Sequence, residues 1–385
     1  MAPPKGGATL GSRERQHGVV SATKTKKTIT QFRDGWVDGF LLFIRVAALV
    51  VISIGAIRSI AMTINGDGTT IEAWTNLAIA GVAQGSMYGM LALGYSMVYG
   101  VLGFINFAHG EVFMGGAMVS FFAAQNLFER GVWESNFALS LTIVLVVAVL
   151  TSTLIAVIVE RVAYRPLRNA PRIIPLITSI GISFFIQYTF AGLFGEGIKN
   201  YPPPPSYLRD KVDLFGVLPI EGTKILVIVV TTVSMLGLYY YVQKTKAGRS
   251  MRAVAEDREI AALMGINVDR TIVSTFAVGG AMAGVAGILW ALLFRSISFI
   301  TGFLPGIKAF TAAVLGGIGN LAGAMVGGLV LGLLESVGTI LILGGWGIPG
   351  AGNLKDVIAF SALVLVLIFR PRGLFGERLT HEDRP

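Results

Sequence analysis

The segment KTKAGRSMRAVAEDREIAALMGINVDR, residues 244–270, decides the fold, because it is polar and lies between two long apolar runs. The runs cover 225–241 before it and 271–294 after it, whereas the segment itself carries six basic and four acidic side chains. Each such charge would cost about 2.5–3.5 kcal/mol at the centre of a lipid bilayer. We therefore expect this segment to lie in water and to join two membrane-spanning helices.

The polar segment is also expected to be folded. Residues 252–264 are rich in Ala, Met, Arg and Glu, which are good helix formers. Gly265 stands where a helix end favours a left-handed residue, and Asn267 or Asp269 is placed to cap the following helix. The sequence predicts a short helix outside the membrane, with the small alanines at 261 and 262 on its surface.

The composition of the whole chain is that of a polytopic membrane protein. Of its 385 residues, 54% are hydrophobic and only 14% are charged, whereas soluble domains carry about 25% charged residues. Apolar runs of about 20 residues recur, and 49 glycines favour close packing of membrane helices. The expected fold is an all-α integral membrane bundle with roughly eight to ten crossings, of which two are broken.

Ten apolar segments are candidate crossings, and Gly or Pro interrupts the third and the eighth. They are 40–62, 74–99, a third from the Gly-rich stretch 100–116 to about 125, 136–159, 173–194, 224–242, 271–294, the broken 296–319, 320–343 and 354–369.

Three parts of the chain are expected to differ in structure. Residues 1–35 predict a disordered basic cytosolic tail, 36–370 a transmembrane domain that includes the loop 244–270, and 371–385 a second cytosolic tail. With the N-terminus inside, the inner segments hold 21 Lys and Arg and the outer segments five. This asymmetry predicts a multi-pass protein of the bacterial inner (plasma) membrane with both termini in the cytoplasm.

Several kinds of chemistry find no support in the sequence. There is no Gly-x-x-x-x-Gly-Lys-Ser/Thr motif for a nucleotide, no nucleophile elbow and no zinc motif. The chain has no Cys and three dispersed His, so no metal site is expected. We expect neither an enzyme nor a catalytic residue. The net charge of +9 is explained by membrane orientation, so we expect no nucleic-acid partner.

The first irregular region places Asn106, His109 and Glu111 beside several glycines at membrane depth. Polar groups and irregular backbone are tolerated there when they line a cavity or pack against protein. Two interpretations stay open and do not exclude each other. These side chains line a solute path, or they satisfy backbone groups that the broken helix frees.

The second irregular region contains Lys308, Thr311 and Glu335. Lys308 follows Pro305 and Gly306, where it would serve as an anchor at the membrane interface or as part of the solute path. Pairing of Glu335 with Lys308 is a further hypothesis. Repeated glycines favour helix packing, and a contact between two permease chains is one use for such ridges.

Four blocks together resemble one family. GYSMVYGVLGFINFAHGEVFMGGA in the region 93–117, AEDREIAALMGINVDR at 255–270, KAFTAAVLGGIGNLAGAMVGGLVLGLLE at 308–335 and FRPRGLFG at 369–376 are similar to the membrane permease subunits of branched-chain amino acid ABC importers. The blocks occur in the order found in that family, and the resemblance spans about 81–376. The N-terminal tail and the Pro-rich segment near 202–205 depart from the family pattern.

The resemblance implies that the loop helix docks into a groove on an ATP-hydrolysing subunit. The residues assigned to this coupling are Glu256, Asp257, Glu259, Ala261, Ala262, Gly265 and Ile266. It also implies a second permease (a homologue or a second copy of this chain), two ATP-binding subunits, an extracytoplasmic solute-binding protein and membrane lipid as partners. ATP and Mg would be held by the partner subunits, so no cofactor is expected on this chain.

The function implied is import of branched-chain or other neutral amino acids, driven by ATP hydrolysis on separate chains. Urea or short amides remain alternative cargoes within the same architecture. An ion-coupled secondary transporter is the alternative from another class, with Glu111 and Glu335 as its candidate coupling sites. Such a carrier has no need of a helix that docks an ATPase, which distinguishes the two hypotheses.

Overall fold

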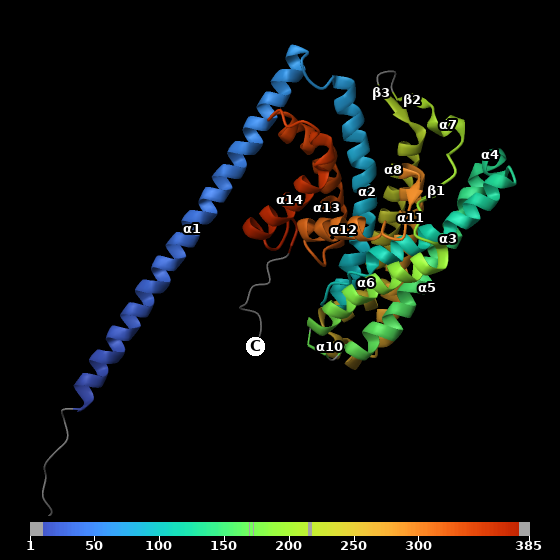
Figure 1. The fold of residues 1–385 in the computed structure, drawn as a ribbon. Coiled ribbons are helices and arrows are strands. Elements are labelled where there is room, and N and C mark those ends of the chain that lie inside the picture. The colour runs from blue at the N-terminus through green and yellow to red at the C-terminus, as the bar shows by residue number, and fades with distance from the viewer. Residues whose placement is uncertain (1–10, 169, 172, 215–217, 377–385) are drawn as a thin grey trace, which may run out of the picture.

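The computed structural model describes residues 11–168, 170–171, 173–214 and 218–376, which are almost entirely helical (Figure 1). The α-helices are α1 Gly11–Asn65, α2 Ile71–Leu102, α3 His109–Glu129, α4 Val132–Ser135, α5 Phe137–Val159, α6 Ile173–Phe194, α7 Ser206–Arg209, α8 Gly222–Lys244, α9 Lys246–Glu256, α10 Arg258–Leu263, α11 Val268–Phe294, α12 Phe303–Gly316, α13 Leu321–Leu333 and α14 Lys355–Phe369. The π- and 3-10 helices are η1 Glu160–Tyr164, η2 Arg165–Leu167, η3 Leu334–Gly344 and η4 Ala351–Asn353. Four short strands, β1 Lys199–Asn200, β2 Lys211–Leu214, β3 Leu218–Glu221 and β4 Ser296–Ile297, form the antiparallel pairs β1–β4 and β2–β3.

The predicted polytopic helical bundle is confirmed. Among the described residues, seven helical segments are long and apolar enough to cross a membrane. The eighth predicted crossing is the 14-residue helix α12. At 1.5 Å per residue it is about 21 Å long, too short for a hydrocarbon core of about 30 Å, so it is a half helix as the sequence predicts.

Helix α2 lies at the centre of the bundle and packs most extensively against α13 (Figure 1). A Cβ added at Gly85 would lie 2.8 Å from the carbonyl oxygen of Gly328, and one at Gly89 would lie 3.1 Å from that of Met325. The two backbones therefore touch, and no larger residue fits between them without movement. This glycine ridge is used inside the chain, which corrects the idea that such ridges form a contact between two permeases.

Helix α1 departs from the prediction for the N-terminal tail. Residues 11–35, expected to be disordered, form the first half of α1, while 1–10 lie outside the described residues. A helix is costly to nucleate and cheap to extend, and this stretch has no Pro to stop extension from the apolar half. Figure 1 shows α1 leaning away from the bundle, which it meets where the indole of Trp346 donates to the Val51 carbonyl over 3.0 Å.

The Pro-rich segment between β1 and α7 packs against the bundle instead of extending into water. The Tyr201 hydroxyl donates to the Ala117 carbonyl of α3 over 2.7 Å. The indole of Trp133 donates to the Pro203 carbonyl over 2.9 Å. These bonds fix the start of the segment on α3 and α4.

The first part of the predicted C-terminal tail, 371–376, packs against the turn between α12 and α13, where Phe375 N donates to Gly316 O over 3.0 Å. Residues 377–385 lie outside the described residues.

Candidate functional site

The two irregular regions predicted from the sequence meet in the structure. Helix α2 ends at the left-handed Gly103, residues 103–108 are non-helical, and α3 starts at His109. Gly110 at the start of α3 faces Gly302 and Gly306 at the start of α12, where a Cβ added at Gly306 would lie 2.9 Å from Gly110 Cα. Because the facing positions on both segments are glycines, which have no side chain, the two backbones can touch at membrane depth.

Beside this crossing lies the Glu111 cluster, which consists of Glu111, Ser183 and Gln187. The carboxylate is fully buried. Its Oε1 accepts hydrogen bonds from the Ser183 hydroxyl over 3.2 Å and from the Gln187 amide over 2.7 Å, both on α6. Its Oε2 has no hydrogen-bond partner in the described part of the chain. A buried carboxylate with neutral partners on only one oxygen is poised to attract a positive charge.

Asn106 and His109 are buried beside this cluster. The Asn106 side-chain oxygen accepts from the Tyr164 hydroxyl over 2.6 Å. The His109 ring meets Tyr95 edge-on at 4.9 Å between centroids, and its Nε2 has no described partner. Two backbone groups of the break meet Ser179 instead: its hydroxyl accepts from Phe107 N over 3.4 Å and lies 3.4 Å from the Ile105 carbonyl, while its shortest bond, over 2.7 Å, goes to Leu176 of its own helix. The prediction that the three polar side chains serve the freed backbone is therefore wrong.

A cavity of about 230 Å³ borders the Glu111 cluster, and we call it the Tyr95 cavity. Tyr95 of α2, Ser183 of α6 and the Phe107 ring contribute to its wall. Its residues Tyr95, Ser183 and the adjacent Gln187 were missed by the sequence analysis. A Gln on the otherwise apolar helix 173–194 was the one available signal, because a polar amide at membrane depth requires a partner.

The residues predicted in the second irregular region form a separate group, the Lys308 cluster, made of Lys308, Glu335, Asp356, Gln84 and Tyr88. Lys308 Nζ lies 3.2 Å from Glu335 Oε1 and 2.6 Å from Asp356 Oδ1. Glu335 Oε2 accepts from Gln84 and from Tyr88, each over 3.1 Å. The hypothesis that Glu335 pairs with Lys308 is confirmed, and Lys308 is too buried to act as an interfacial anchor.

The predicted solute-path residues thus divide between two places. The Thr311 hydroxyl is buried and donates to the Ile307 carbonyl of its own helix over 2.9 Å. Lys308 is held by two carboxylates, and no hydrogen bond or ion pair joins its cluster to the Glu111 cluster among the described residues. Asn106, His109 and Glu111 thus have separate partners, which are Tyr164, Tyr95 and helix α6. Among the described residues, Lys308 and Thr311 bond to none of these three.

The predicted helix 252–264 is broken at Asp257, which separates α9 from α10. Asp257 has an extended backbone (φ −154°, ψ 119°), and its carboxylate accepts from the amides of Glu259 at 2.8 Å and Ile260 at 2.9 Å. An Asp that caps a new helix in this way ends the preceding one. Gly265 has the expected left-handed conformation, with φ +81°, and the predicted cap of α11 is Asn267.

The short helix α10 presents an apolar surface to solvent, formed by Ile260, Leu263 and Met264. Their exposed fractions are 59%, 86% and 77%. Ala262 is exposed beside them, whereas Ala261 is buried against the bundle, so its predicted place on the surface is wrong. Of the other predicted coupling residues, Glu256, Asp257, Glu259 and Gly265 are exposed and Ile266 is half-buried. Exposed apolar residues gathered on one turn outside the membrane are typical of a docking surface.

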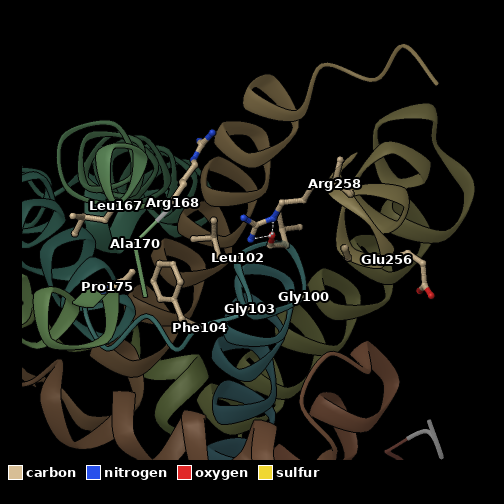
Figure 2. A pocket seen from close by; sticks show the side chains of 13 residues that line it. Gly100, Leu102, Gly103, Phe104, Leu167, Arg168, Ala170, Pro175, Glu256 and Arg258 are labelled. Carbon is tan, nitrogen blue, oxygen red and sulfur yellow. Dashed lines mark hydrogen bonds between the residues drawn. The ribbon is translucent and has the colours of Figure 1, made fainter. Parts of the chain in front are cut away.

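Arg258, the first residue of α10, ties this surface to the end of α2. Its Nε and Nη2 donate to the Val101 carbonyl over 3.0 and 2.6 Å (Figure 2). Burial, and then the nearby charge of Arg168, lower the pKa of Arg258 from its ordinary value. Both arginines border a cavity of about 370 Å³ between the end of α2, the segment after α5 and helix α9.

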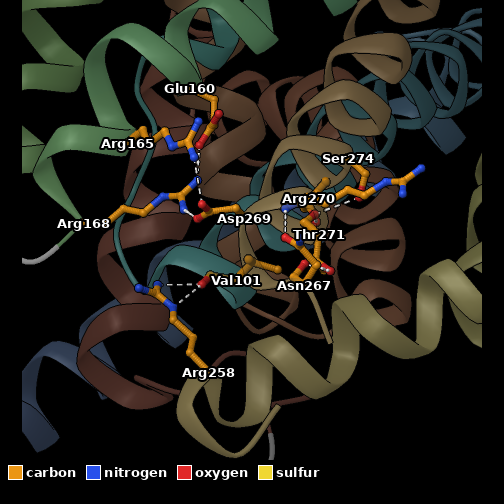
Figure 3. A network of polar contacts seen from close by, with 11 residues as sticks. Val101, Glu160, Arg165, Arg168, Arg258, Asn267, Asp269, Arg270, Thr271 and Ser274 are labelled. Carbon is orange, nitrogen blue, oxygen red and sulfur yellow. Dashed lines mark hydrogen bonds and ion pairs between the residues drawn. The ribbon is translucent and has the colours of Figure 1, made fainter. Parts of the chain in front are cut away.

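A polar network holds α11 to the segment that follows α5 (Figure 3). Asp269 accepts from Arg165 over 2.8 Å and also from Arg168, which bonds Glu160 as well. The start of α11, directly after α10, is thereby fixed to η1 and η2. Within the described residues, no group of three or more His, Cys, Asp or Glu is placed to hold a metal ion.

A multi-pass helical bundle with a mostly apolar cavity beside a buried carboxylate, and with an exposed apolar turn at α10, has the architecture of a membrane transport subunit. The family model described as branched-chain amino acid transport system, permease component, matches residues 77–367. The chain belongs to this family. Helix α1 precedes the matched region.

Several named proteins are similar to this chain. The high-affinity branched-chain amino acid transport system permease protein BraD of Pseudomonas aeruginosa is 41% identical over 78% of this chain and 94% of its own length. LivH of Escherichia coli K12, with the same description, is 41% identical over 77% of this chain and 94% of its own length. The autoinducer 2 import system permease protein LsrC of Yersinia enterocolitica is 31% identical over 52% and 53%.

Proposed function

We propose that this chain is the permease subunit of an importer that moves branched-chain amino acids across the bacterial inner membrane, powered by ATP hydrolysis on separate subunits. The observation that carries the proposal is the 41% identity to permeases of high-affinity branched-chain amino acid transport, over 94% of their length. Because one relative is named for import of a different solute, autoinducer 2, other cargoes should be tested as well, and urea and short amides are among them.

The apolar surface of α10 is the proposed contact for an ATP-binding subunit. Ile260, Leu263 and Met264 gain most from being covered, because burial of apolar area is the main favourable term in association. Through the bond from Arg258 to Val101, movement of α10 would pull on the end of α2, which carries Tyr95 about 10 Å further along its axis. Since the ATP-binding subunits would lie on the cytoplasmic side, α10 and both termini would face the cytoplasm.

The remaining partners follow from the same proposal. Two permeases, this chain with a homologue or with a second copy, would sit above two ATP-binding subunits, and a solute-binding protein would deliver cargo from outside. ATP and Mg would be bound by the partner subunits. With ATP hydrolysis placed on the partner subunits, this chain would be a transport subunit and not an enzyme.

Uptake by reconstituted vesicles tests the function directly. Vesicles with the permease, its ATP-binding subunits and its binding protein should accumulate leucine, isoleucine or valine only when ATP is supplied, and should be tested against other neutral amino acids and urea. Accumulation driven by a proton or sodium gradient with no ATP-binding subunit would overturn the proposal.

Docking is tested by co-purification with the ATP-binding subunit. Glu259→Lys reverses a charge on the α10 surface, and Ala262→Trp adds bulk to it, so both should weaken the complex. Tyr240→Trp, on the exposed and apolar face of α8, is the control because it lies outside the docking surface. Normal co-purification and normal uptake by both α10 variants would contradict this assignment.

A further inference from the structure

We propose that the Tyr95 cavity is a transit site that binds the charged groups of the amino-acid cargo. Ser183 would accept a hydrogen bond from its ammonium, and Tyr95 would donate one to its carboxylate. This inference rests on the proposed function, because it names the groups of the cargo that the permease itself contacts. Neither Tyr95 nor Ser183 stands out in the sequence, and only their place in the structure identifies them.

Ser183 presents an acceptor to the cavity. Its single hydroxyl proton is used in the 3.2 Å bond to Glu111 Oε1, so the lone pairs are what remain for a ligand. An ammonium group has donors only and matches such an acceptor. The Glu111 carboxyl directly behind Ser183 holds the hydroxyl in this orientation and, when ionised, attracts an ammonium through surroundings that screen charge weakly.

Tyr95 supplies the complementary donor. Its ring lines the cavity, the residue is only 5% exposed, and its hydroxyl, which is covered in this conformation, has no acceptor for its proton in the described part of the chain. A buried hydroxyl without a partner is costly, which indicates that a bound group completes it. The edge contact with His109 orients the ring, and a cargo carboxylate would accept from its hydroxyl.

The rest of the wall suits an aliphatic side chain. Phe107, Phe184 and Phe303 supply rings, two isoleucines complete the wall, and no charged side chain is among the described residues that line it. The volume of about 230 Å³ equals the liquid share of roughly eight waters, which fits a small solute. It is smaller than the roughly 300–1,000 Å³ of sites for drug-sized ligands.

One side of the cavity is open in the single chain. Phe184 and Phe303 stack at 6.5 Å between ring centroids, and each is 46% exposed. A second permease placed against these two rings would close the cavity on that side. The cargo would then pass between two chains, and each chain would present the hydroxyls of its own Ser183 and Tyr95.

Glu111 is a positioning residue, because it acts on the cargo through Ser183. Gln187 holds its Oε1 over 2.7 Å, and the close approach of Gly302 leaves little room for the carboxylate to turn away. In Glu111→Gln, an amide donor replaces part of the acceptor, so Ser183 is no longer forced to turn its lone pairs to the cavity.

The test measures binding to the purified permease as thermal stabilisation by leucine, by 3-methylbutylamine, which lacks the carboxylate, and by 4-methylpentanoate, which lacks the ammonium. Ser183→Ala and Glu111→Gln should raise the half-saturating concentration of leucine and of the amine about tenfold or more, the effect of one charge-assisted hydrogen bond. They should not weaken the response to 4-methylpentanoate, because that analogue has no ammonium to lose. Tyr95→Phe, which removes a single oxygen, should do the reverse.

The matched control is Ser120→Ala, a buried serine bonded to carbonyls of its own helix α3 and to Tyr201, away from this cavity. It should respond like the wild type. Equal loss for both analogues in the three cavity variants, or no loss in any of them, would overturn the transit site. Leucine uptake by the wild-type complex is measured alongside. Absent uptake refutes the proposed function, whereas normal uptake with unaffected variants refutes the transit site alone.

Discussion

Glu111 and Glu335 are both fully buried carboxylates inside the helical bundle, and they have different kinds of partner. Glu335 is neutralised from within by Lys308 at 3.2 Å and is also hydrogen-bonded by Gln84 and Tyr88. Glu111 has the neutral partners Ser183 and Gln187 and borders a cavity. The first carboxylate has a cation beside it within the chain, whereas the second has no cationic partner among the described residues.

This difference separates a structural pair from a candidate binding group. The Lys308 cluster joins α2, α12, η3 and α14 around the two ion pairs of Lys308, so its expected role is to hold these helices together. The Glu111 cluster joins only α3 and α6, beside backbones that already touch. Loss of the Lys308–Glu335 pair should therefore act on stability alone, whereas changes in the Glu111 cluster should act on binding as well as on stability.

The largest effect is expected for Lys308→Met. Removing one partner of a buried ion pair leaves an uncompensated charge and costs about 3–5 kcal/mol. The melting temperature of the purified permease in detergent should therefore fall sharply. The double variant Lys308→Met with Glu335→Met removes both charges and should recover most of the loss. A double variant no more stable than the single one would show that the pair is not the structural element described here.

A smaller and unequal effect is expected for the two glutamines. Gln187→Leu leaves the Glu111 carboxylate with Ser183 as its single donor among the described residues, and a lost bond to a charged group costs about 1.5–3 kcal/mol. Gln84→Leu leaves Glu335 with Lys308 and Tyr88, so its cost should be lower. Comparing the two melting temperatures tests the contrast directly. An equal or reversed order would contradict it.

The next effect comes from the glycine contact beside Glu111. A Cβ in Gly302→Ala would lie 2.6 Å from Glu111 Oε2 and would also press on the Gly110 carbonyl. Overpacking of this kind costs about 1–3 kcal/mol, and here it should also reduce leucine binding by displacing the carboxylate. Gly237→Ala in α8, where nothing lies within 4 Å of the new Cβ, is the matched control and should leave both measurements unchanged. Equal behaviour of the two variants would show that the close contact has no influence on the site.

Several features of the fold and of the two carboxylate clusters can be predicted from local sequence patterns. Charges in 244–270 and glycines near 103–110 and 302–306 predict the external loop and the two broken segments, because solvation and backbone freedom depend on the residues themselves. The pairing of Glu335 with Lys308 was within reach as well, since a buried charge needs a partner of opposite sign.

The cavity could not be predicted in the same way. Ser183 and Tyr95 are ordinary residues on apolar helices, and their meeting depends on how α2, α6 and α12 pack in three dimensions. The break at Asp257 was missed because nearby residues favour helix, while the cap geometry that ends α9 involves a competing side-chain bond. Helix α1 was missed because a polar composition was given more weight than continuity with the adjoining apolar helix.

The smallest effect is expected for Asp356→Asn at the edge of the Lys308 cluster. Asp356 lies 2.6 Å from Lys308 Nζ, but its side chain is 48% exposed, unlike that of Glu335. Exposed ion pairs contribute at most about 1 kcal/mol, so the melting temperature should change little and leucine binding not at all. Glu335→Gln, which removes the buried partner of the same lysine, should cost distinctly more. If Asp356→Asn proved the more damaging, the stabilising pair would lie at the rim of the cluster, and Glu335 would be the carboxylate left free to act.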